Sequence, residues 1–147
     1  GDPTTIPIKT KVGTLHFYLS QCLEAEKVGK SFELHTKEYW YRIQEKAGLK
    51  ETALIRWEYN SALSSKLPKE CRNHLHLASN LPLSDGSDLD LDKLHIPTGW
   101  VTIEEVLRFL IVDLGVNPLC GSSWPKVLRD SEEPFFSEFS TRRTKGD

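Results

Sequence analysis

The segment Thr98-Gly-Trp-Val-Thr-Ile-Glu-Glu-Val-Leu-Arg-Phe-Leu-Ile-Val-Asp-Leu-Gly115 predicts one buried helix and marks both of its ends. Thr102 caps the start, and Glu105, three residues later, completes a Thr-x-x-Glu capping box that satisfies two backbone N–H groups. Apolar residues then keep the one-face helical spacing over three turns, at Ile103, Val106, Leu107, Leu110, Ile111 and Leu114. Phe109 and Val112 lie off that stripe, so the helix is apolar around most of its circumference, which is typical of a central core element.

Three further helices are expected before this segment, each followed by a residue that ends a helix. Their ranges are 14–28, 37–47 and about 51–66, followed by Gly29, Gly48 and Pro68. The spacing places Leu15 and Leu19 on one face of the first helix, Trp40 and Ile43 on the inward face of the second, and Tyr59 on that of the third.

The middle of the chain gives a mixed pattern. Residues 72–78 alternate at period two like a strand, although Pro68 could equally open a short helix there. Residues 79–98 have the composition of a loop, within which 88–92 also alternates and could pair with 74–78. After the core helix, a short helix is expected from Trp124 to Arg129, with one or two more turns over 131–140.

These elements predict a mainly α fold, a single compact domain of five or six helices with at most a small two-stranded β element. An extended N-terminal arm or edge strand is expected over 1–13, the globular helical domain over 14–140 and a mobile basic tail over 141–147. A chain of 147 residues suits one such domain.

Composition is that of an ordinary soluble globular protein, with 38% hydrophobic and 27% charged residues. The longest strongly apolar stretch, 106–114, is too short to span a membrane, and no signal peptide is visible. Because the chain lacks methionine, we expect an excised fragment or a processed product, from which a targeting segment could have been removed.

Cysteine usage favours a reducing, intracellular setting, cytoplasmic or nuclear. Cys22, Cys71 and Cys120 are an odd number at wide spacings, and no Asn-x-Ser/Thr glycosylation site occurs. All three are expected to be reduced and to act as small core residues.

No catalytic residue, metal or cofactor is predicted. The run Asp88-x-Asp90-x-Asp92 lacks the glycine and the acidic residue that a calcium loop needs at its sixth and twelfth positions. Zinc ligation by Cys71, His74 and His76, with Cys120 or His95 recruited, is disfavoured by geometry. On a helix the two histidines would point to nearly opposite faces, and on a strand Cys71 would face away from both.

The most suggestive constellation is aromatic and basic. Three consecutive aromatic residues, 39–41, cannot all face one core from a helix, so at least one is expected at the surface. The leading hypothesis is a non-catalytic protein-interaction domain that docks a partner protein segment through an exposed patch, because Trp, Tyr and Arg dominate binding at interfaces. The expected patch consists of Tyr39, Tyr41, Arg42, Arg56 and Trp57.

The runner-up is a nucleic-acid-binding domain for RNA or single-stranded DNA, and an enzyme of unidentified class comes third. Residues 1–75 carry 12 Lys and Arg against 9 Asp and Glu, a net charge of +3. Residues 76–147 carry 7 against 12, a net charge of −5. The basic half and its aromatic rings favour nucleobase stacking, but neither half has the concentrated basic patch of a typical nucleic-acid binder.

Overall fold

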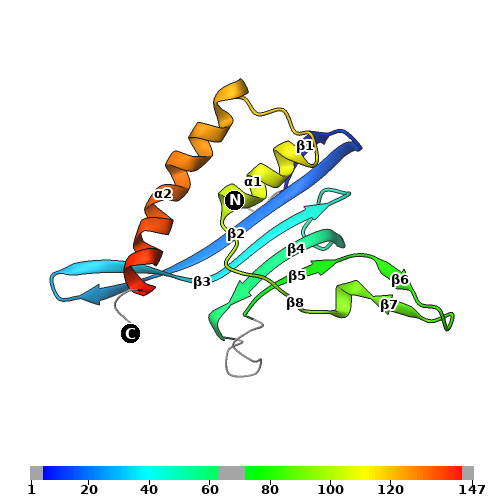
Figure 1. The fold of residues 1–147 in the computed structure, drawn as a ribbon, viewed down its shortest axis with the longest axis horizontal. Coiled ribbons are helices and arrows are strands. Elements are labelled where there is room, and N and C mark those ends of the chain that lie inside the picture. Colours follow the sequence, from blue (N-terminus) through cyan, green and yellow to red (C-terminus); the bar gives the residue numbers. More distant parts are fainter. Residues whose placement is uncertain (1–4, 63–71, 144–147) are drawn as a thin grey trace. The chain divides into compact units, whose positions relative to one another are not determined.

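Strands dominate the fold, so the prediction of a mainly α domain is wrong. The computed structural model describes residues 5–62 and 72–143, with side chains to 137 (Figure 1). Its strands are β1 (Ile6–Thr10), β2 (Gly13–Val28), β3 (Ser31–Gln44), β4 (Ala53–Asn60), β5 (Asn73–Leu77), β6 (Asn80–Pro82), β7 (Asp88–Asp90) and β8 (Ile96–Pro97). The helices are η3 (Leu91–Lys93), α1 (Ile103–Val112), η4 (Gly121–Ser123) and α2 (Trp124–Arg143), of which η3 and η4 are 3-10 helices.

Six strands form one sheet in the order β1-β2-β3-β4-β5-β8, which Figure 1 shows side by side. The pairs β2–β3, β3–β4, β4–β5 and β5–β8 are all antiparallel. β6 and β7 form a separate two-stranded sheet. Residues 73–77 therefore belong to the main sheet, as the strand alternative predicted, whereas 88–90 pairs with 80–82 and not with 74–78.

The expected helices over 14–28, 37–47 and 51–66 are wrong because a spacing of four residues fits both periods. Leu15 and Leu19 share a face in a helix, but they also share one in a strand, with Phe17 between them on that face. In β3 the buried hydrophobic residues are Tyr39, Tyr41 and Ile43, which follow period two. Aromatic and β-branched side chains of this kind favour strands.

Two glycines that were expected to end helices lie instead in the connections between strands. Gly29 has a φ of 63°, in the left-handed region that glycine adopts without strain, and lies in the tight turn that joins β2 to β3. Gly48 lies between β3 and β4 with a φ of 121°. Its carbonyl and that of Lys46 accept hydrogen bonds from the buried Gln44 side chain, at 2.5 and 2.8 Å.

One face of the sheet, which we call the aromatic face, is built from cross-strand pairs of rings. Tyr39 lies opposite Tyr59, and their ring centroids are 5.7 Å apart. Trp100 packs edge-on against Tyr39 at 5.5 Å. The Tyr39 hydroxyl donates to Asn73 Oδ1 at 2.9 Å, so this buried ring also satisfies its polar atom.

The chain divides into two compact units, Gly1–Ile8 with Thr14–Val101 and Lys9–Gly13 with Thr102–Asp147. The expected N-terminal arm, 1–13, is thus shared between them, and residues 6–10 form the edge strand β1. The expected tail, 141–147, begins inside α2, and residues 144–147 lie outside the described part of the chain.

The second unit contains the helix that the sequence marked most clearly, and its capping box is confirmed. Thr102 Oγ1 accepts from the Glu105 backbone N–H at 3.2 Å, and the Glu105 carboxylate accepts from the Thr102 N–H at 2.9 Å. Arg108 Nη2 of α1 donates to both carboxylate oxygens of Glu132 in α2, at 3.0 and 3.1 Å. No helix within 5–62 and 72–143 is long and apolar enough to cross a membrane.

The cysteines differ from expectation in their burial. Cys22 and Cys120 are free thiols, and both are exposed, so the expectation that they are core residues is wrong. Cys71 lies outside the described residues.

Candidate metal centre

Two neighbouring strands bring four polar side chains to the sheet face opposite the aromatic one, which we call the polar face. In the register of β4 and β5, Glu58 lies beside His74 and Arg56 beside His76. The side chains of a strand alternate between faces, so these four project from one side. His74 and His76 are only 2% and 5% exposed.

A third imidazole joins the pair from a distant part of the chain. His95 directly precedes β8, which pairs with β5 so that Pro97 lies opposite His74. The three rings meet edge to face, with centroids 4.8 to 5.0 Å apart. One ligand atom from each ring lies within 4.8 Å of the other two. His95 is exposed, so the cluster is open to solvent on that side.

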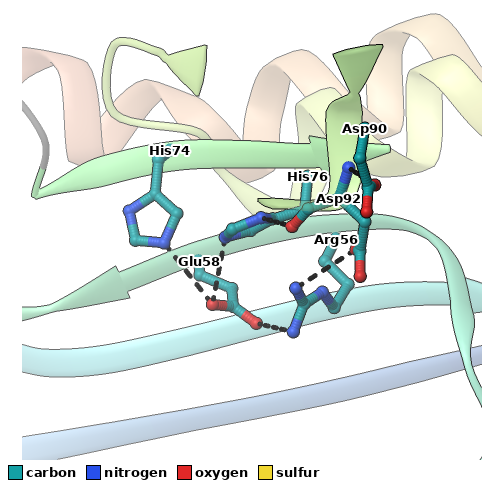
Figure 2. A network of polar contacts seen from close by, with 6 residues as sticks. All are labelled: Arg56, Glu58, His74, His76, Asp90 and Asp92. Atoms are coloured by element: carbon teal, nitrogen blue, oxygen red, sulfur yellow. Dashed lines mark hydrogen bonds and ion pairs between the residues drawn. The ribbon is translucent and has the colours of Figure 1, made fainter. Parts of the chain in front are cut away.

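Glu58 points one carboxylate oxygen at the imidazoles and the other away from them (Figure 2). Its Oε2 lies 3.4 Å from His74 Nε2 and 3.9 Å from His76 Nε2. Its Oε1 forms an ion pair with Arg56 Nη1 at 3.2 Å, and Arg56 Nη2 also reaches Asp92 Oδ1 at 3.4 Å. Arg56 therefore holds Glu58 by one oxygen and leaves the other for the histidines.

The orientation of His76 is fixed by the backbone of η3. Its Nδ1 lies 2.9 Å from the Asp92 carbonyl oxygen. A carbonyl only accepts hydrogen bonds, so Nδ1 carries the proton and the neutral ring has a lone pair on Nε2. Burial lowers the pKa of His76, which favours that neutral form. The Asp90 side chain accepts from the Asp92 backbone N–H at 3.1 Å and steadies the turn that supplies this carbonyl.

The His76 lone pair and the Glu58 oxygen are both acceptors, and they face each other inside the cluster. Such a pair is stable only with a proton or a cation between its members. Zinc bonds to imidazole nitrogen are about 2.1 Å long, which in a tetrahedron places the ligand atoms roughly 3.4 Å apart. The Glu58 oxygen already lies near that spacing from His74 Nε2, and the imidazole ligand atoms lie within 4.8 Å of one another. A set of three nitrogens and one oxygen fits zinc and other first-row divalent ions.

The five residues predicted to bind a partner do not form one surface. Tyr39 and Tyr41 are 1% and 2% exposed on the aromatic face, so the expectation that they are surface anchors is wrong. Trp57 lies on the same face, opposite Tyr41, and is partly exposed. Arg42 and Arg56 lie on the polar face, as their cross-strand pairing shows.

Trp40, which was expected to face inward, is partly exposed and lies on the polar face, between Tyr39 and Tyr41 in the chain. It is therefore the exposed member that the aromatic run 39–41 was expected to contain.

Part of the cluster was visible in the sequence. His74 and His76 were weighed as zinc ligands, and the strand places both on one face. The missing partners are His95, considered only as a recruit, and Glu58, which no spacing connects to the histidines. Cys71 lies outside the described residues, and Cys120 belongs to the other unit. Of the aspartates at 88–92, Asp90 caps η3 and Asp92 pairs with Arg56.

Comparison of the chain with known protein families, curated proteins and solved structures finds no match.

Proposed function

We propose that this chain is a metal-binding protein that holds one first-row divalent ion, zinc foremost, between His74, His76, His95 and Glu58. The observation that carries the proposal is that one ligand atom from each of three imidazoles lies within 4.8 Å of the other two, while one Glu58 carboxylate oxygen contacts two of these rings. Neutral imidazole and carboxylate are ligands that such ions prefer. Three ligands on paired strands and a fourth directly before a strand give the site a rigid frame.

The surroundings of the cluster match those of metal ligands in proteins. A metal-bound histidine usually donates its second ring N–H to a carbonyl or a carboxylate, as His76 does to the Asp92 carbonyl. A ligating carboxylate is usually held by a further hydrogen bond, as Glu58 is by Arg56. These contacts orient the ligands before an ion arrives, which lowers the cost of binding it.

The competing explanation is a cluster in which protons take the place of the ion. A proton on Nε2 of one histidine could bridge to Glu58, and the cluster would then only stabilise the sheet. This explanation assigns no purpose to the third imidazole, which is exposed and contributes little buried surface. A bound ion would use all three rings and, through the exposed side at His95, would remain accessible to a ligand. Such an ion polarises bound oxygen groups and lowers the pKa of bound water.

Zinc titration of the whole chain against a chromophoric chelator tests the proposal. We expect one equivalent of zinc to bind, and we expect His74→Ala or His76→Ala to weaken binding by at least about 100-fold. His35→Ala is the matched control, since it removes an imidazole in the β2–β3 hairpin, outside the cluster. Zinc affinity that is equal in the wild type and in His74→Ala, or that falls as much in His35→Ala, would contradict the proposal.

A second candidate is the docking of a partner protein segment, at a place other than the one the sequence suggested. Large apolar side chains are exposed along the outer part of the β2–β3 hairpin, at Leu23, Val28, Phe32 and Leu34. Among the described strands, residues 23–28 and 31–36 pair only with each other. An extended segment with apolar side chains could add a strand to that edge. Phe32→Ser with Leu34→Ser should then weaken a partner's binding by at least about tenfold, whereas His76→Ala should not.

A further inference from the structure

Arg42 lies in the same row of the polar face as the candidate metal centre. It pairs across β3 and β4 with Arg56, which pairs across β4 and β5 with His76. Neighbouring strands are about 4.8 Å apart, so the Arg42 backbone lies roughly 10 Å from that of His76. All three side chains project from one face, so a small molecule on that face can reach both Arg42 and the cluster.

The two neighbouring arginines differ in how their charge is balanced. Arg56 is held by Glu58 and Asp92, at 3.2 and 3.4 Å. No carboxylate lies within ion-pair distance of Arg42 among the side chains that the structure describes. Like charges directly opposite each other on a sheet are unfavourable, and only the Arg56 charge is compensated. The row therefore carries one uncompensated positive charge beside the cluster.

The Arg42 side chain is also held in place. Its guanidinium lies over the rings of Tyr18 and Trp40, with its central carbon 5.8 and 5.4 Å from their centroids. Its Nε is buried without a hydrogen-bond partner. Cation–π contacts account for the orientation of the group, but they leave this N–H donor unused. A guanidinium held in one orientation, on a side chain that is partly exposed, is suited to a planar or tetrahedral oxyanion.

We infer that the metal centre takes a small oxyanionic ligand, a carboxylate or a phosphate, whose charged group pairs with Arg42. This inference rests on the proposed function. A divalent ion with one carboxylate ligand leaves the centre with a net positive charge, so the ion and Arg42 attract the same class of ligand. A molecule with an oxygen donor at one end and an oxyanion at the other would satisfy both, and Arg42 would select for its length.

The test uses the full chain loaded with Co(II), whose visible absorption changes when a ligand joins the ion. The probes are inorganic phosphate and a series of straight-chain dicarboxylates from malonate to adipate, so that the two sources of oxyanion and the preferred length are separated. We expect one of these probes to bind at least about tenfold more weakly to Arg42→Gln than to the wild type, with cobalt affinity unchanged within about threefold. Arg42→Lys keeps the positive charge but lacks the planar pair of guanidinium donors, so its loss of probe affinity should be intermediate.

Arg129→Gln is the matched control, because it removes one exposed arginine from α2. Equal binding of every probe by Arg42→Gln and the wild type would overturn the inference, and so would cobalt binding without any probe binding. A wild-type chain that fails to bind cobalt before any probe is added would overturn the proposed function as well. If Arg42→Gln fails to fold, the test uses Arg42→Lys alone. Arg42→Lys that binds every probe with the affinity and the length preference of the wild type would then contradict the inference.

Discussion

The two faces of the sheet formed by β3, β4 and β5 are built from alternating residues of the same strands, yet they differ in chemistry. The aromatic face carries Tyr39, Tyr41 and Tyr59 in ring-to-ring contact. The polar face carries Arg42, Arg56, Glu58, His74 and His76, and ion pairs join Arg56 to Glu58 and Glu58 to His74. We infer that the aromatic face stabilises the fold, and the proposed metal centre lies on the polar face. Substitutions on the two faces should therefore have separable effects.

The largest expected effect is on the aromatic face. Tyr39→Ala should lower the free energy of unfolding by about 3 to 5 kcal/mol, because it removes a buried ring and its hydrogen bond to Asn73. Trp40→Ala, one residue along and on the polar face, should cost less than half as much, since that ring is partly exposed. Urea unfolding of both variants measures the difference. Equal losses would remove the distinction between the faces.

Zinc should stabilise the chain only when the polar face is intact. Free zinc at 100 times its dissociation constant should add about 2.7 kcal/mol to the free energy of unfolding of the wild type. His76→Ala should show almost none of this gain at the same zinc concentration, because it lacks one of the ligands. Thermal melts with and without zinc measure the effect. An equal gain in both proteins would place the zinc elsewhere.

Without metal, stability should fall as the pH drops below about 6.5. Burial lowers the folded-state pKa of His76, so between its unfolded value, about 6.5, and that lowered value the unfolded chain binds more protons than the folded one. The effect vanishes above that window and is limited to about 1.4 kcal/mol per pH unit for one proton. The charged and titratable groups that face this ring are Arg56, Glu58, His74 and His95.

Urea midpoints at pH 5.5 and 7.5 test this pH dependence. His76→Gln should remove the part of the pH dependence of stability that comes from His76, whereas His35→Gln in the hairpin should leave that part unchanged. A slope that survives in His76→Gln would assign the proton uptake to another group.

The smallest effect on stability is expected in the outer part of the β2–β3 hairpin, beyond the strands that carry the two faces. Phe32 lies in the outer hairpin, beyond the segment of β3 that pairs with β4, and is 70% exposed. Phe32→Ser should change the free energy of unfolding by no more than about 0.5 kcal/mol. A loss comparable to that of Tyr39→Ala would mean that the outer hairpin is part of the core.

The sequence predicted the structure best where a local signal was complete. The capping box at Thr102 and Glu105 and the stripe that follows it identify α1, because capping and helical spacing act within a few residues. The strands β2, β3 and β4 were missed because apolar residues four apart share a face in a helix and in a strand alike, as Leu15 and Leu19 do. The aromatic composition of residues 39–43 was the stronger signal, and it favours strands.

The candidate site could be predicted only in part, for a similar reason. His74 and His76 share a face once residues 73–77 are known to be a strand. His95 reaches them through the pairing of β8 with β5, and Glu58 through the register of β4 with β5. Both depend on strand pairing between distant segments, which local spacing does not encode.

X-ray absorption spectroscopy of the zinc-loaded full chain decides whether the metal centre exists, because it identifies the atoms bound to the ion. We expect a first shell of nitrogen and oxygen at about 2.0 to 2.2 Å, with the outer-shell scattering of three imidazoles. This pattern should lose one imidazole in His76→Ala. A sulfur ligand at about 2.3 Å would contradict the account, since it would assign the ion to a cysteine, and so would a shell without imidazole.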